Sequence, residues 1–299
     1  MTGGGAYRTV DANGARFEVL TAGEGDRLAL CLHGFPEHAI SWRHQLPLLV
    51  RLGYRVWAPN QRGYGNSFRP AAVAEYDVAR LLDDVAGLID ASKARSITLL
   101  GHDWGAAVAW LFATRRVRAL ERLVILNVPH PALFARSLRA SPRQRLRSWY
   151  MGFFQLPWLP ERLLGFDRAR GIGDAFLRTA CDRSRFPSDV VDLYRSCASE
   201  PGALTAMLNW YRAAPAGMRA QFKLGFPPID VPTLMLWGEN DAALGKETTY
   251  GTHRYASDLR LHYLPGVSHW VQQEAPERVN EFLEAFLTLS SKQLDGIRP

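Results

Sequence analysis

Short, largely apolar runs recur along the first half of the chain, and segments with helical periodicity separate them. The segments 78–89 and 104–113 place their apolar residues at helical spacing. The apolar runs are typical of strands buried on both faces; they cover residues 28–32, 54–58, 97–100 and 123–126. This alternation predicts an α/β fold with a mostly parallel central sheet and helices on both faces.

The pattern changes after residue 129. From 130 to about 225 the chain is rich in arginine, tryptophan and helix-like stretches and lacks a convincing buried strand. Two further strands, at 233–237 and 259–264, and an amphipathic helix at 276–289 are then predicted. We therefore expect a core formed by 1–129 and 226–299, a helical cap formed by 130–225, and a frayed end at 290–299.

Composition places this chain of 299 residues among globular proteins, because 47% of its residues are hydrophobic. No apolar run approaches the roughly 18 residues of a membrane span, and the N-terminus lacks a secretory pattern. We expect no stable membrane insertion and a cytoplasmic location. Cys31, Cys181 and Cys197 form no even disulfide set, which favours a reducing compartment, with Cys31 as a small buried residue.

The net charge is +7, and only four of the 36 basic residues are lysines. The arginines are scattered and no nucleic-acid-binding motif accompanies them, so we expect no nucleic-acid partner. Five arginines cluster at positions 136, 139, 143, 145 and 147. Four of them, at 136, 139, 143 and 147, repeat at helical spacing. A solvated helix face is the first interpretation of this cluster, and an anionic partner or membrane surface is the alternative.

Candidate chemistry lies between an expected strand and an expected helix. Asp103 stands there between Gly101 and Gly105, in the pattern of the nucleophile elbow of α/β-hydrolases. The usual serine is absent, since the chain contains no G-x-S-x-G. A carboxylate that attacks a saturated carbon forms an ordinary ester, which water can hydrolyse. Taken alone, the pentapeptide also fits a polar residue in a glycine-bounded turn.

Other segments agree with an elbow. The backbone N–H groups of Phe35, in the loop after the first buried strand, and of Trp104 are expected to form an oxyanion hole. His269 follows a later strand and is the candidate base. Asp241 and Glu239, two residues apart after another strand, are both candidates for the acid that orients His269.

The remaining histidines offer no metal site. No His, Cys and carboxylate cluster has the spacing of metal ligands, so we expect no metal. His38, His44, His253 and His262 are expected at surface or helix positions.

Taken together, these motifs resemble an epoxide hydrolase of the α/β-hydrolase fold. The resemblance runs from His33 to the closing helix; its matching pieces are 33–37 with 41–45, 62–67, 101–105, 148–155 and 208–212. It favours Asp241 over Glu239 as the acid, and it implies that Tyr150 and Tyr211 of the cap lie over the nucleophile.

The resemblance implies a mechanism in two half-reactions. Asp103 attacks an epoxide carbon while the two phenols bind the ring oxygen, giving a hydroxyalkyl ester. Water activated by His269 and Asp241 then hydrolyses the ester and releases a vicinal diol. The implied partners are a small hydrophobic epoxide and water, with no cofactor. The physiological role would be detoxification, catabolism of an environmental epoxide or processing of a signalling lipid.

Aromatic residues of the insertion predict an apolar pocket for such a substrate; they are Trp149, Tyr150, Phe153, Phe154, Trp158 and Phe166. The candidates for direct substrate contact are His33, Pro36, Trp149, Phe154, Trp210 and Trp270.

Three alternatives share parts of this pattern. A haloalkane dehalogenase has the same Asp–Trp elbow, but it commonly has a polar halide-binding residue where this chain has Phe35, and a halide needs no tyrosine acid. A haloacid dehalogenase typically has arginine where this chain has Trp104. A non-catalytic ligand-binding protein of the same fold tends to lose members of the triad, and every expected position is filled here.

Overall fold

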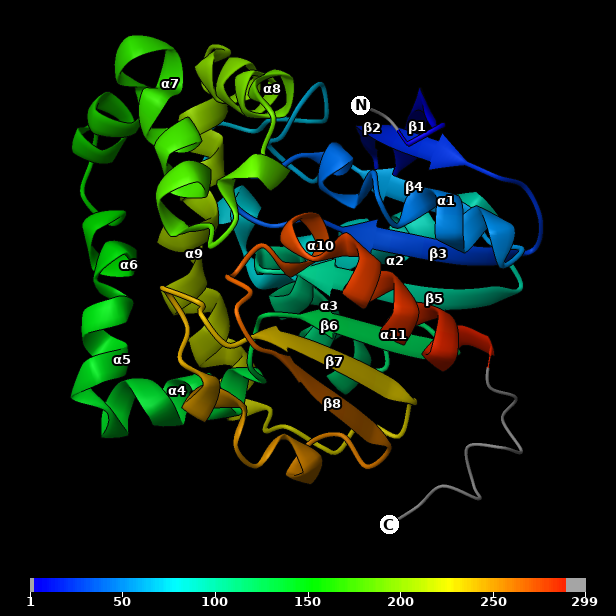
Figure 1. Ribbon diagram of the computed structural model, residues 1–299. Coiled ribbons are helices and arrows are strands. Elements are labelled where there is room, and N and C mark those ends of the chain that lie inside the picture. Colours follow the sequence, from blue (N-terminus) through cyan, green and yellow to red (C-terminus); the bar gives the residue numbers. More distant parts are fainter. Residues whose placement is uncertain (1–2, 289–299) are drawn as a thin grey trace.

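The computed structural model describes residues 3–288 and is organised around one eight-stranded sheet (Figure 1). Across the sheet the strands run in the order β1-β2-β4-β3-β5-β6-β7-β8, and from β4 to β8 all neighbours are parallel. Their bounds are β1 (Ala6–Ala12), β2 (Ala15–Ala22), β3 (Arg27–Leu32), β4 (Arg55–Pro59), β5 (Ser96–His102), β6 (Arg122–Leu126), β7 (Thr233–Gly238) and β8 (Leu259–Leu264).

The apolar runs correctly predicted strands β3 to β8, which form the parallel part of the sheet. The sequence interpretation missed β1 and β2, which pair antiparallel with each other. Most of β1 is exposed, so it has no apolar run by which it could be recognised. The expected α/β architecture is confirmed, with an antiparallel hairpin added at one edge.

Helices cover both faces of the sheet. In Figure 1, α1 (Leu46–Arg51) and α11 (Pro276–Thr288) lie in front of the sheet, and α2 (Val78–Ser92) and α3 (Trp104–Thr114) lie behind it. The short helix α10 (Val271–Glu274) precedes α11. Single 3-10 turns complete the connections; they are η1 (Ala39–Trp42), η2 (Val73–Tyr76), η3 (Arg183–Arg185), η4 (Lys246–Thr249) and η5 (Thr252–Arg254).

Six helices lie between β6 and β7 in the chain and stand beside the carboxyl ends of the parallel strands (Figure 1). They are α4 (Pro131–Ala140), α5 (Pro142–Arg147), α6 (Trp149–Phe153), α7 (Leu159–Thr179), α8 (Ser188–Ser199) and α9 (Ala203–Lys223). We call them the cap helices. A non-helical segment at 166–169, with left-handed backbone at 167–169, interrupts α7, which therefore consists of two helical segments. The division into core and cap at 130 and 225 stays a prediction.

The arginine cluster does not lie on one continuous helix. Ser141 separates α4 from α5, and its hydroxyl accepts a hydrogen bond from the Gln144 N–H as the N-cap of α5. The helical spacing seen in the sequence therefore crosses a helix boundary. Arg136, Arg139 and Arg143 are nevertheless exposed, as a solvated face requires.

Two histidines lie where the sequence interpretation did not expect them. His38 is buried against Asn60, and burial lowers its pKa to about 3. His262 is a half-buried residue of β8 and stacks on Phe282.

Cys31 is fully buried in β3, as expected. Within residues 3–288, no helix has both the length and the apolar character that crossing a bilayer requires.

Candidate active site

The turn between β5 and α3 carries Asp103 in a strained backbone conformation, with φ 48° and ψ −123°. Glycine is required on both sides of it. A Cβ at Gly101 would lie 2.5 Å from the Gly105 carbonyl oxygen, and one at Gly105 would lie 2.6 Å from the His33 carbonyl oxygen. The close approach of strand, loop and helix therefore fixes the turn and holds the Asp103 carboxylate at the end of the strand.

One oxygen of Asp103 is bound by the loop after β3. The Phe35 N–H donates a hydrogen bond of 2.7 Å to Asp103 Oδ1. Trp104 is the first residue of α3, directly after Asp103. Its N–H therefore has no intrahelical acceptor. Pro36 follows Phe35 through a cis peptide bond. The fold therefore brings Phe35, from a separate loop, next to the carboxylate, and Trp104 follows Asp103 directly in the chain.

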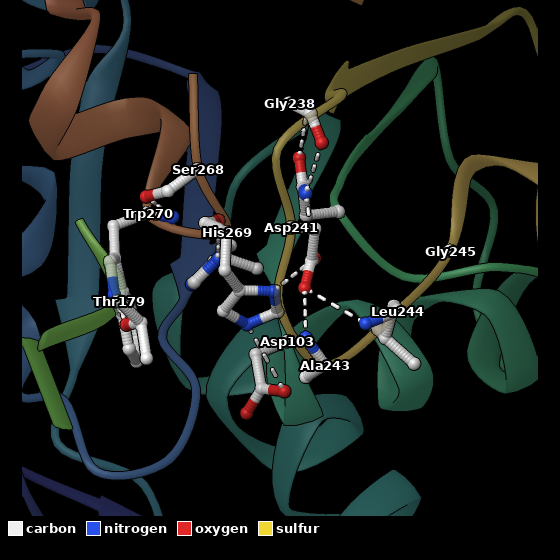
Figure 2. Close-up of polar contacts among 12 residues, drawn as sticks. Asp103, Thr179, Gly238, Asp241, Ala243, Leu244, Gly245, Ser268, His269 and Trp270 are labelled. Carbon is white, nitrogen blue, oxygen red and sulfur yellow. Dashed lines mark hydrogen bonds and ion pairs between the residues drawn. The ribbon is translucent and has the colours of Figure 1, made fainter. Parts of the chain in front are cut away.

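The second oxygen of Asp103 faces an imidazole. His269 Nε2 lies 3.5 Å from Asp103 Oδ2, and His269 Nδ1 lies 2.6 Å from Asp241 Oδ2. Figure 2 shows the ring of His269 between the two carboxylates. Glu239 instead forms an ion pair with Lys246. The geometry therefore pairs the imidazole with Asp241.

Asp241 is held by hydrogen bonds on both of its oxygens. The N–H groups of Ala243 and Leu244 donate to Oδ1 at 2.8 and 2.9 Å (Figure 2), and the Asn127 amide donates to Oδ2 at 2.8 Å. Asn127 directly follows β6 with φ 45°, a conformation that asparagine tolerates well. Sequence reasoning missed Asn127, although an asparagine directly after a buried strand was the available signal.

The charges of these groups depend on one another. Burial opposes the ionisation of Asp103 and Asp241, but hydrogen bonds and charge from His269 hold both pKa values below the ordinary range. Burial alone would lower the pKa of His269, and the two carboxylates raise it well above its ordinary value. The directions of these pKa shifts favour an imidazolium between two carboxylates in the resting site.

A buried Glu–His pair stands behind the imidazole. His102 Nδ1 lies 2.7 Å from Glu37 Oε2, and His102 Nε2 lies 2.9 Å from the His269 carbonyl oxygen. Glu37 also accepts hydrogen bonds from the Gly34 N–H and from two glutamine amides of α10. This network joins the loop that binds Asp103 to the loop that carries His269. Glu37 and His102 lie in the segments 33–37 and 101–105 that carry the resemblance, but no role was predicted for either.

A cavity of about 460 Å³ opens over Asp103 and Trp104. Its walls come from α2, α3 and the cap helices α4, α6 and α9, and nearly all of them are apolar. Tyr150 and Tyr211 line it, with ring centroids 6.0 Å apart. Burial raises the pKa of both phenols, so both remain protonated donors.

The side chains expected to contact substrate lie mostly behind the cavity wall. Phe154 packs against Phe35 and Tyr211. Trp210 is buried against Trp104 and donates to the Arg62 carbonyl oxygen. None of the six candidates is among the residues that line the cavity.

Two of these candidates, Trp270 and His33, are buried beside the loops of the candidate site. Trp270 is buried beside His269 and donates to the Thr179 hydroxyl. His33 is fully buried, accepts from the Gln61 N–H, and has a pKa lowered by burial to about 4. Both side chains therefore support the loops at the site.

The side chain of Trp149 does not line this cavity. Its side chain is 63% exposed on α6, whereas the next residue, Tyr150, faces the cavity. Successive residues on a helix point about 100° apart, so Trp149 and Tyr150 point in different directions. Trp158 and Phe166 are also exposed. The apolar walls are instead completed by side chains that carry no sequence signal, such as Phe134, Leu138, Met218 and Phe222.

Within residues 3–288, no three His, Cys, Asp or Glu side chains are grouped to hold a metal ion.

The chain is similar to known proteins in sequence and in fold. Residues 30–276 match the model of the alpha/beta hydrolase fold family. The chain is 39% identical to the AB hydrolase superfamily protein YfhM of Bacillus subtilis, over 93% of this chain and 96% of that protein. It is 34% identical to Epoxide hydrolase 4 of Homo sapiens, over 97% of this chain and 80% of that protein.

Among solved structures, the fold is similar to that of an epoxide hydrolase from Bacillus megaterium in complex with an inhibitor, with a TM-score of 0.87 and 29% identity. That similarity covers 94% of this chain and all of the other.

The charge coupling predicts a titration. In the wild type the His269 imidazole should stay protonated at neutral pH, because its pKa lies well above the ordinary value. Asp241→Asn removes one of the two neighbouring charges, so the His269 pKa should fall toward its ordinary value near 6.5. Nuclear magnetic resonance of the histidine ring nitrogens measures this. Asp230→Asn, at an exposed carboxylate, is the control; an unchanged His269 pKa in Asp241→Asn would contradict the coupling.

Proposed function

The chain belongs to the epoxide hydrolases of the α/β-hydrolase fold, and we propose that it converts a hydrophobic epoxide and water into a vicinal diol through an ester on Asp103. One observation carries this proposal. An attacking carboxylate, a paired imidazole and two protonated phenols all lie at or beside one apolar cavity. A carboxylate nucleophile suits attack at a saturated carbon, and phenols suit a developing alkoxide.

In the first half-reaction Asp103 Oδ2 attacks one epoxide carbon. A bond forms between that oxygen and the carbon, and the carbon–oxygen bond of the ring breaks. The ring oxygen takes a proton from the phenol of Tyr150 or Tyr211, which both line the cavity with Asp103. The products are a hydroxyalkyl ester and a phenolate. Oδ1 stays hydrogen-bonded to the Phe35 N–H and becomes the ester carbonyl oxygen.

Ester formation then changes the protonation of His269. The ester carries no charge, so one of the two carboxylates that raise the pKa of His269 is lost. The imidazolium therefore becomes a stronger acid and gives up its proton, which restores the phenol. Asp241 keeps the neutral imidazole oriented through Nδ1, and Nε2 is free to accept a proton.

In the second half-reaction His269 takes a proton from water, and the hydroxide attacks the ester carbonyl carbon. The N–H groups of Phe35 and Trp104 stabilise the negative charge on the carbonyl oxygen. The ester bond to the substrate breaks, and the departing alkoxide takes the proton of the new carboxyl group. Asp103 returns as a carboxylate and His269 as an imidazolium, and one epoxide and one water have become a diol.

The cavity supports a hydrophobic substrate. Apart from Asp103, the two phenols and Gln155, its walls are apolar or aromatic, so apolar substituents of an epoxide would be buried there.

The three cysteines are free, which supports a reducing compartment such as the cytoplasm.

Isotope labelling tests the covalent route. With enzyme in excess over a styrene-type epoxide in heavy-oxygen water, the diol of the first turnover should carry an oxygen from Asp103 and none from solvent. Later turnovers should carry solvent oxygen. Mass spectrometry of the diol reads the label. Solvent oxygen in the first diol would exclude the ester, and halide release from a bromoalkane without diol formation would point to a dehalogenase.

Removal of the phenol groups tests their role. Tyr150→Phe and Tyr211→Phe should each slow ring opening, up to a factor of about 10²–10⁴ if that phenol is the acid. Rapid-quench measurement of ester formation separates this step from hydrolysis. Tyr250→Phe, at a tyrosine that is 55% exposed, is the matched control and should be unchanged. Ring opening at the wild-type rate in the double variant would remove the two tyrosines from the mechanism.

A further inference from the structure

Large apolar side chains are exposed on the cap in unusual number. Within the described residues, six of the thirteen exposed large hydrophobic side chains lie in the 21 positions from 146 to 166. They are Leu146, Trp149, Leu156, Trp158, Leu163 and Phe166, and we call them the cap face. Single exposed apolar residues are ordinary on any surface, whereas a concentration of this kind indicates an interaction surface.

The cap face lies on the outside of the molecule. Its residues come from α5, α6, the first segment of α7 and the connections between them. Figure 1 shows α5, α6 and the start of α7 along the edge of the molecule that is farthest from the sheet. Phe166 is 71% exposed and begins the non-helical segment that interrupts α7. The cap face therefore belongs to no interface within this chain.

Positive charge accompanies these apolar residues. Residues 131–158 contain five arginines and no acidic residue. Within residues 3–288 none of these five arginines forms an ion pair, although arginines of neighbouring helices do, as Arg212 does with Glu161. Arg139 and Arg145 donate only to backbone carbonyl oxygens, which leaves their charge uncompensated.

We propose that the cap face docks on the surface of an anionic lipid bilayer. Tryptophan and phenylalanine favour the boundary between headgroups and acyl chains, and arginine is attracted to anionic headgroups. In the docked protein Trp149, Trp158 and Phe166 enter this boundary, and Arg139 and Arg143 contact lipid phosphates. The attachment is peripheral, because it uses exposed side chains of short helices.

Charge distinguishes a bilayer from a second copy of this chain. A two-fold symmetric dimer through the cap face would bring the two arginine clusters toward each other. The segment 131–158 offers no carboxylate to pair with them, and of the next two carboxylates along the chain Glu161 is already paired with Arg212, which leaves Asp167. An anionic bilayer satisfies the apolar and the basic side chains together.

Docking would place the cavity close to the bilayer. Helix α6 carries Trp149 on its outer side, and Tyr150 and Met151 line the cavity on its inner side. An apolar epoxide concentrated in the membrane would then be near the site. This consequence rests on the proposed function, but the docking itself does not, because it can be measured without substrate.

Vesicle co-sedimentation of the full chain tests the proposal. Wild type should bind vesicles of phosphatidylcholine with phosphatidylglycerol much better than phosphatidylcholine alone, and added salt should weaken binding. Arg143→Gln should lower the partition coefficient about fivefold. The double variant Trp158→Ser with Phe166→Ser should lower it at least about tenfold.

Controls keep the result specific. Leu224→Ser and Arg8→Gln change exposed residues outside the cap face and should bind as wild type does. Thermal unfolding and turnover of a water-soluble epoxide should be unchanged in every variant. The proposal is wrong if wild type ignores the anionic lipid or if the cap-face variants bind normally. A dimer in wild type that the double variant dissociates, without vesicle binding, would assign the face to a second copy instead.

Discussion

The site depends on one interaction, the placement of a single imidazole between two carboxylates. His269 contacts Asp103 through one ring nitrogen and Asp241 through the other. Each carboxylate stabilises the positive ring, and the ring in turn keeps both carboxylates ionised despite their burial. When Asp103 is converted into a neutral ester, its charge no longer raises the pKa of His269, so the ring loses its proton more easily. In the proposed mechanism, the same contact prepares a nucleophile first and a base afterwards.

The backbone is strained at Asp103, the residue that carries one of these two carboxylates. Asp103 has a positive φ that only the tight approach of Gly101 and Gly105 to neighbouring backbone permits. The buried pair of Glu37 and His102 then links the loop beneath Asp103 to the carbonyl of His269. Parallel strands supply these loops from one edge of the sheet, so groups distant in sequence meet at fixed distances.

The sequence predicted the parallel strands and the elbow because both leave strong local patterns, apolar runs and paired glycines. Tyr150 and Tyr211 came only from the resemblance, and the structure places them at the cavity with Asp103. The cavity walls could not be predicted, because which face of a cap helix turns inward depends on tertiary packing. Trp149 illustrates this, since it lies beside Tyr150 in sequence and points outward.

The proposed mechanism requires a covalent ester on Asp103, and this ester can be trapped. His269→Gln removes the base and leaves the nucleophile, so an epoxide should be opened and the ester should accumulate. Mass spectrometry of the acid-quenched, digested protein should find the peptide containing Asp103 heavier by the mass of one epoxide. An unmodified Asp103 peptide, together with continued diol formation by His269→Gln, would contradict the account.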